Sequence, residues 1–132
     1  MQQQPNAFRR IRLELARSRE YPEGSATHGY EFVAPLDARA HIDPALWHKY
    51  RDRCQVRRFW GDIEQAGHLV HKPGGAEHAI WSISYDAAAE DDEKGYRFGA
   101  HAFSPGEYVS LSDHAGEMHT FRVAAVTPTT LS

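Results

Sequence analysis

Three histidines flank a Pro-Gly-Gly turn in the stretch "GHLVHKPGGAEHAIWSISY", which covers residues 67–85. Imidazole nitrogens bind Zn²⁺, so His68, His71 and His78 are the first candidates for a metal site. His68 and His71 are three residues apart, and the alternation of a strand places them on opposite faces. His68 and His71 therefore cannot bind the same metal ion unless the strand contains a bulge.

The hairpin predicted around this turn brings the other two histidines together. With a loop of residues 73–76, His71 lies directly opposite His78. Opposed residues have Cβ atoms about 4.5–5.5 Å apart, close enough for two imidazoles to meet one ion. A zinc site needs at least a third protein ligand, and the sequence fixes no position for His41 or His101. We expect an exposed histidine pair and no cofactor, with a divalent metal at His71 and His78 as the alternative.

Two other groups of polar residues allow a chemical interpretation. Cys54 is the only cysteine, and His48, six residues before it on a predicted helix, points in another direction. We therefore expect Cys54 to pack as a small apolar residue. Asp113, His114, Glu117 and His119 occur together in "DHAGEMH", and carboxylates and histidines near a turn could bind a metal. Asp113 is typical of the first position of a turn, and His119 falls on the apolar face of its strand, where we expect one hydrogen bond.

Basic residues are concentrated in two stretches although the net charge is −3. Residues 9–19 contain five arginines, and residues 49–58 contain four arginines and a lysine. The simplest interpretation is that these basic residues lie on solvated faces of the protein. The negative net charge argues against dedicated nucleic-acid binding. The sharper alternative is a ligand or partner surface formed by Arg57, Arg58 and Trp60, in which the ring would stack on bases.

The spacing of apolar residues indicates strands over most of the chain. In "FRRIRLELAR" every second residue from Ile11 to Leu15 is apolar, the pattern of a half-buried strand. In "HAIWSISY" the residues Trp81, Ile83 and Tyr85 share one bulky face, which would fill a barrel interior. Further strands are expected in "HGYEFVAPL", "QVRRFW", "HLVHK", "YRFGAHAF", "EYVSL" and "MHTFRVAAV". The last two place these residues in the core: Val109, Leu111, Phe121, Val123 and Ala125.

One short helix is predicted near residues 44–54. Asp43 is a good N-cap, and Pro44 suits the first helical position. Leu46, Trp47, Tyr50 and Cys54 then share one face. The predicted fold class is all-β and mostly antiparallel: a small β-barrel or strongly curled meander sheet of about eight strands, with this helix plugging one end or side.

Four stretches of the sequence carry a resemblance. "HGYEFVAPLD", "RDRCQVRRFW", "GHLVHKPGG" and "SPGEYVSLSDHAGEMHTFRV" resemble parts of a small family of uncharacterised bacterial proteins, over most of residues 11–126. The resemblance implies a complete small protein. That family has no established activity, so the resemblance supplies no catalytic residue.

Length and composition limit the class of protein to which the chain can belong. A chain of 132 residues fits a single domain, 1–132, with flexible tips expected at 1–7 and 127–132. No apolar run has the length of a secretion signal or a transmembrane helix, so we expect a cytoplasmic protein without membrane contact.

The function expected from the sequence is binding without catalysis, because no acid, base and nucleophile converge. The partner would be a protein or a small ligand, nucleic acid is not expected, and a homodimer stays open. The alternatives are a metal-dependent enzyme using His71 and His78, and a nucleic-acid-binding module using Arg57, Arg58 and Trp60.

Overall fold

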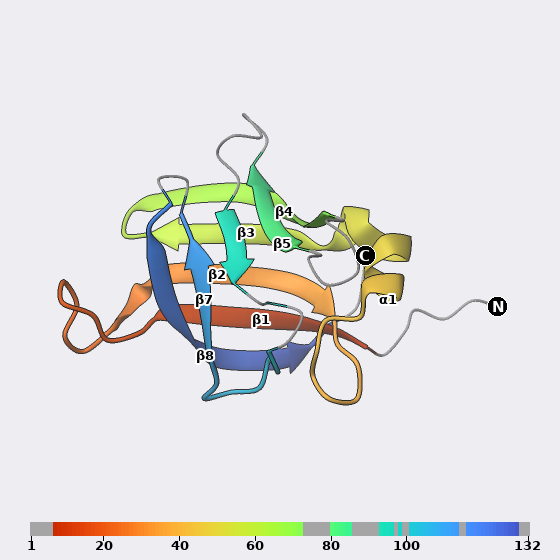
Figure 1. Cartoon of the computed structure of the whole chain (residues 1–132), viewed down its shortest axis with the longest axis horizontal. Coiled ribbons are helices and arrows are strands. Elements are labelled where there is room, and N and C mark those ends of the chain that lie inside the picture. Colours follow the sequence, from red (N-terminus) through yellow and green to blue (C-terminus); the bar gives the residue numbers. More distant parts are fainter. Residues whose placement is uncertain are drawn as a thin grey trace.

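The strands of the protein close into one antiparallel barrel. The computed structural model describes residues 7–72, 80–85, 93–96, 98, 101–113 and 116–129. Within them, each strand pairs with its neighbours in sequence and the last pairs with the first (Figure 1). The strands are β1 (Phe8–Leu15), β2 (Ser25–Pro35), β3 (Gln55–Trp60), β4 (Ile63–Lys72), β5 (Ile80–Tyr85), β6 (Glu93–Tyr96), β7 (Tyr108–Ser112) and β8 (Met118–Pro128). The predicted all-β barrel is confirmed.

Alternation along β1 builds the middle of the core. Ile11, Leu13 and Leu15 are buried, and Ile11 lies opposite Phe32 of β2 and Val126 of β8. Burial of each such side chain contributes about 1.5–3 kcal/mol. This burial favours the strand over the helix that the arginine, leucine and glutamate content would otherwise support.

A β-bulge in β8 changes which residues face the core. Arg12 lies opposite Ala125, but Leu13 lies opposite Val123, so one residue of β8 is inserted between them. An inserted residue reverses the alternation beyond it. Ala125 is consequently half-buried, whereas Val126 packs against the core. The prediction that Ala125 belongs to the core was wrong.

The inner face of β5 and the connection after β6 fill the barrel. Trp81, Ile83 and Tyr85 are buried, as predicted. The strand predicted over "YRFGAHAF" was wrong in extent, because β6 ends at Tyr96. Phe98 and Phe103 are buried within the connection instead, with ring centroids 5.2 Å apart.

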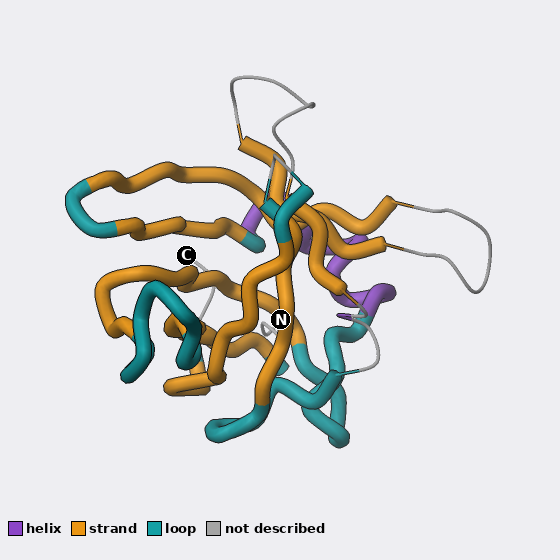
Figure 2. The backbone as a smooth tube through the Cα atoms, turned by 60° about the vertical axis from the view of Figure 1, so that its left-hand side comes forward, coloured by secondary structure: helices purple, strands orange, loops and turns teal. Residues whose placement is uncertain are grey.

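The helix α1 (Pro44–Tyr50) packs against the barrel, as predicted. The side chain of Asp43 accepts hydrogen bonds from the first turn, and a 3₁₀ turn, η1 (Arg51–Arg53), continues the helix. Trp47 is buried, and its Nε1 donates to the carbonyl oxygen of Leu69 at 2.9 Å. Figure 2 shows the strands, in orange, curving around the barrel, with the helical segment, in purple, against one side.

Strand β8 continues into the segment expected to be a flexible tip. Thr127 lies opposite Arg10 and Pro128 opposite Arg9, and the Thr129 N–H donates to the carbonyl oxygen of Phe8 at 3.2 Å. The strand therefore reaches past residue 126. In the part of the chain that the structure describes, no helix has the length and apolar character needed to span a membrane.

Candidate ligand-binding groove

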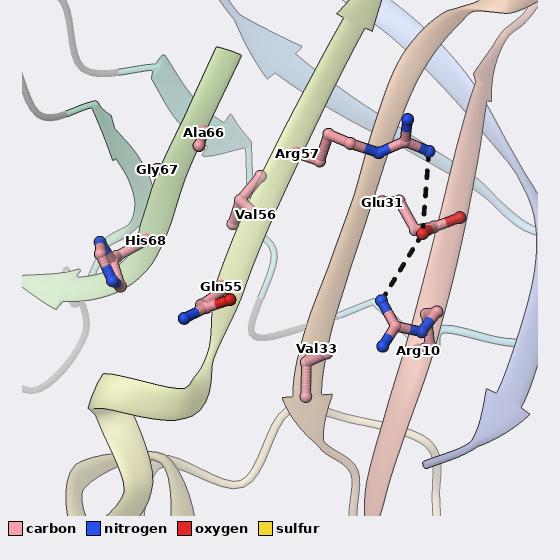
Figure 3. A pocket seen from close by; sticks show the side chains of 9 residues that line it. All are labelled: Arg10, Glu31, Val33, Gln55, Val56, Arg57, Ala66, Gly67 and His68. Atoms are coloured by element: carbon pink, nitrogen blue, oxygen red, sulfur yellow. Dashed lines mark ion pairs between the residues drawn. The ribbon is translucent and has the colours of Figure 1, made fainter. Parts of the chain in front are cut away.

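A groove opens on the outer face of the barrel where two strands separate. β2 and β3 pair from His28 and Trp60 as far as Phe32 and Val56. Beyond that pair they diverge, because residues 36–54 form the connection that contains α1. The resulting groove has a volume of about 450 Å³ and is lined by Arg10, Glu31, Val33, Gln55, Val56, Arg57, Ala66, Gly67 and His68 (Figure 3).

Two arginines approach one glutamate from opposite sides of this groove. Glu31 Oε1 lies 3.6 Å from a terminal nitrogen of Arg10 on β1 and 3.8 Å from one of Arg57 on β3 (Figure 3). Both distances exceed the roughly 2.7–2.9 Å of a charge-assisted hydrogen bond. The side chains of Arg10 and Arg57 are 50% and 47% exposed, against 23% for Glu31. The contacts of both guanidinium groups with Glu31 are therefore loose, and both groups remain accessible to solvent.

Neighbouring residues fix the orientation of Arg57. A terminal nitrogen of Arg57 donates to Glu64 Oε1 at 2.9 Å, and its guanidinium lies 5.4 Å from the ring centre of Phe59. Phe59 points outward but is buried, because Arg12 covers it at 4.4 Å. It lies opposite Gly29, where an added Cβ would come 1.9 Å from a backbone oxygen of β1. The strands can approach this closely only because residue 29 is glycine.

The surface predicted from Arg57, Arg58 and Trp60 is divided between the two faces of β3. Arg57 lies opposite Glu31 on the outer face, whereas Arg58 and Trp60 share the other face. The Arg58 guanidinium lies 4.4 Å from the Trp60 ring centre. The structure thus places Arg58 against Trp60, and it brings Arg57 together with Arg10 and Glu31. Arg10 and Glu31 were not predicted as site residues, although alternation in β1 and β2 places both on outer faces.

The hairpin of β4 and β5 has a different register from the predicted one. His71 lies opposite Trp81, and Lys72 lies opposite Ile80. Residues 73–79 therefore connect the strands, and the four-residue loop was wrong. The His71 ring stacks on Trp81 with centroids 4.2 Å apart. His78 lies outside the described residues, so the metal pair of His71 and His78 stays a prediction.

Partial burial gives His71 a testable effect on stability. Desolvation lowers the pKa of His71 below its ordinary 6.5. Between the lowered pKa and about 6.5 the unfolded chain then binds more protons at this residue than the folded protein does, so stability falls as the pH falls through that window. We expect His71→Phe, which retains a ring against Trp81, to reduce the loss of unfolding free energy between pH 7 and 5. Urea denaturation at each pH measures the loss.

The exposed His68 provides the control for this experiment. His68→Gln should leave the pH dependence of stability as it is in the original protein. Equal losses of stability in the original protein and in His71→Phe would contradict the effect assigned to His71.

Comparisons with known proteins found no relative of this chain. No family model, no curated protein and no solved structure matches the chain. The resemblance to a bacterial family stays a prediction, and the groove must be interpreted from its own geometry.

Proposed function

We propose that the protein is a non-catalytic binding module whose groove on β1–β4 takes a small ligand bearing a carboxylate or phosphate group. The convergence of Arg10 and Arg57 on Glu31 carries this proposal. Two cations and one anion line the groove, so an anionic group that enters it meets a positive balance of charge. Arginine suits carboxylate and phosphate because its planar group offers five N–H donors in a fixed fork.

The remaining lining favours binding over chemistry. Gln55 and His68 are exposed at the other end of the groove and offer hydrogen-bonding groups for the rest of a polar ligand. The thiol of Cys54 is buried outside the groove. The described lining therefore supplies donors and acceptors without a paired nucleophile and base.

The nucleic-acid alternative receives less support from this arrangement. It requires Arg57, Arg58 and Trp60 on one surface, and they occupy two faces of β3. A single, free and buried cysteine suits a reducing compartment, and we propose a cytoplasmic location on that basis.

Removal of Arg10 should weaken anion binding about tenfold. A loss of about 1.4 kcal/mol, close to the value of a hydrogen bond to a charged group, corresponds to that factor. The measurement is a titration of ¹⁵N-labelled protein with citrate and, separately, inorganic phosphate. We expect saturable shifts of the amide signals of Gln55, Ala66 and His68, with weaker binding in Arg10→Gln.

Arg122 provides a matched control for this titration. Its side chain is 47% exposed and pairs loosely with Glu14, but it lies outside the groove. Arg122→Gln removes the same charge and should leave the affinity unchanged. Equal weakening in Arg10→Gln and Arg122→Gln would show a general charge effect and refute the groove as the site. Tighter binding of an oligonucleotide than of citrate, lost in Trp60→Ala, would favour the nucleic-acid alternative.

A further inference from the structure

The turn between β7 and β8 holds three side chains that ligate metals. The Gly116 N–H donates to the carbonyl oxygen of Asp113 at 2.9 Å, which confirms the predicted turn. Gly116 has a φ of 84°, a conformation that glycine adopts without strain. The turn returns the chain so that Asp113, Glu117 and His119 come together.

The ligand atoms of these three residues converge. One carboxylate oxygen each from Asp113 and Glu117 and one imidazole nitrogen of His119 lie within 4.8 Å of one another. His119 Nε2 is 3.0 Å from Asp113 Oδ2. Two ligands of a tetrahedral zinc ion are about 3.3 Å apart when each bond is about 2.0–2.1 Å long. Asp113 and His119 are already close to this spacing, and the exposed side chain of Glu117 can turn to complete the set.

The surroundings hold two of the three ligands in place. Asp113 Oδ1 accepts a hydrogen bond from the Glu117 N–H at 2.9 Å, which leaves Oδ2 directed at His119. The His119 ring lies against Trp60, with centroids 5.9 Å apart, and its backbone is fixed opposite Leu111 in the sheet. Ligands positioned in this way lose little conformational freedom when an ion binds.

We propose that Asp113, Glu117 and His119 form a Zn²⁺ site, with solvent completing the coordination. The imidazole distinguishes this set from a group of carboxylates. Imidazole suits Zn²⁺, whereas Mg²⁺ prefers oxygen ligands in octahedral geometry. Three protein ligands with one position left open match the coordination of zinc sites in which solvent fills the fourth position. The site is separate from the groove, so neither proposal depends on the other.

Calorimetric titration of protein without a histidine tag, with ZnCl₂ and with MgCl₂, tests the proposal. We expect one tight site for Zn²⁺ and markedly weaker binding of Mg²⁺. Glu117→Gln and His119→Ala should each lower the Zn²⁺ affinity at least tenfold. Glu117 is exposed and its side chain supports no other described contact, so Glu117→Gln should retain the fold even where His119→Ala does not.

Two control variants separate this site from general binding by surface residues, since the chain has nine histidines. Glu107→Gln removes an exposed carboxylate near the same hairpin, and His48→Ala removes an exposed imidazole on α1. Both should keep the Zn²⁺ affinity of the original protein. An affinity that is unchanged in Glu117→Gln, or equal for Mg²⁺ and Zn²⁺, would overturn the proposal and leave the pair of Asp113 and His119 as a turn-stabilising hydrogen bond.

Discussion

Replacement of Trp47 with alanine should lower the free energy of unfolding by about 3–5 kcal/mol, the usual cost of truncating a large buried aromatic side chain. Trp47 is 7% exposed. Its ring meets Trp81 edge to face, with centroids 5.4 Å apart, and also contacts His71. The truncation would open a cavity between α1 and the barrel. It would also remove the donor that satisfies the buried carbonyl group of Leu69.

A second substitution separates packing from hydrogen bonding. Trp47→Phe retains an aromatic ring but leaves the Leu69 carbonyl group without its donor, which should cost about 1–3 kcal/mol. The neighbouring His48 is exposed, so His48→Ala should change stability by less than about 0.5 kcal/mol. Urea denaturation followed by circular dichroism measures all three. If Trp47→Ala costs no more than His48→Ala, α1 does not stabilise the barrel as described.

The elements that could be predicted from the sequence depend on local patterns. Alternation from Ile11 to Leu15 and from Trp81 to Tyr85 reflects a backbone with side chains on alternate faces, so one buried face is visible in the sequence. The helix was equally local, because Asp43 caps it and Pro44 fits its first turn. The pairing of neighbours then follows from the tendency of consecutive strands to lie side by side in a sheet.

The errors arose where tertiary packing overrides those patterns. The bulge opposite Arg12 and Leu13 moves Ala125 out of the core and brings Val126 toward it, and nothing local marks the inserted residue. The predicted register of β4 and β5 rested on an assumed loop of four residues. Pairing of His71 with Trp81 instead of His78 follows from a longer connection, which the Pro-Gly-Gly sequence alone does not specify.

The groove was missed for a related reason. The sequence predicted Arg57 as part of a ligand or partner surface, but the prediction grouped it with its sequence neighbours Arg58 and Trp60. Its partners in space, Arg10 and Glu31, come from β1 and β2. Assembling them requires the register of three strands at once, and a single sequence does not fix registers between strands.

Cys54 should react with a thiol reagent roughly a thousandfold more slowly in the folded protein than in the unfolded chain. Burial raises the pKa of Cys54 from its ordinary 9.0 to about 12. Only the thiolate is nucleophilic, and each pKa unit above the working pH lowers its fraction about tenfold. The side chain is fully buried, and Sγ lies 3.7 Å from the carbonyl oxygen of Tyr50, so restricted access slows the reaction further.

The rate is measured with a chromogenic disulfide reagent at pH 8, with and without urea. An exposed thiol provides the comparison: Ala26→Cys, combined with Cys54→Ala, places a cysteine at a solvent-exposed position of β2. We expect this thiol to react at nearly the same rate with and without urea. A native Cys54 that reacts within tenfold of that rate would mean that the segment joining η1 to β3 opens readily. Because that segment leads directly into Gln55 and Arg57, a slow Cys54 would indicate that this wall of the groove is rigid before any ligand binds.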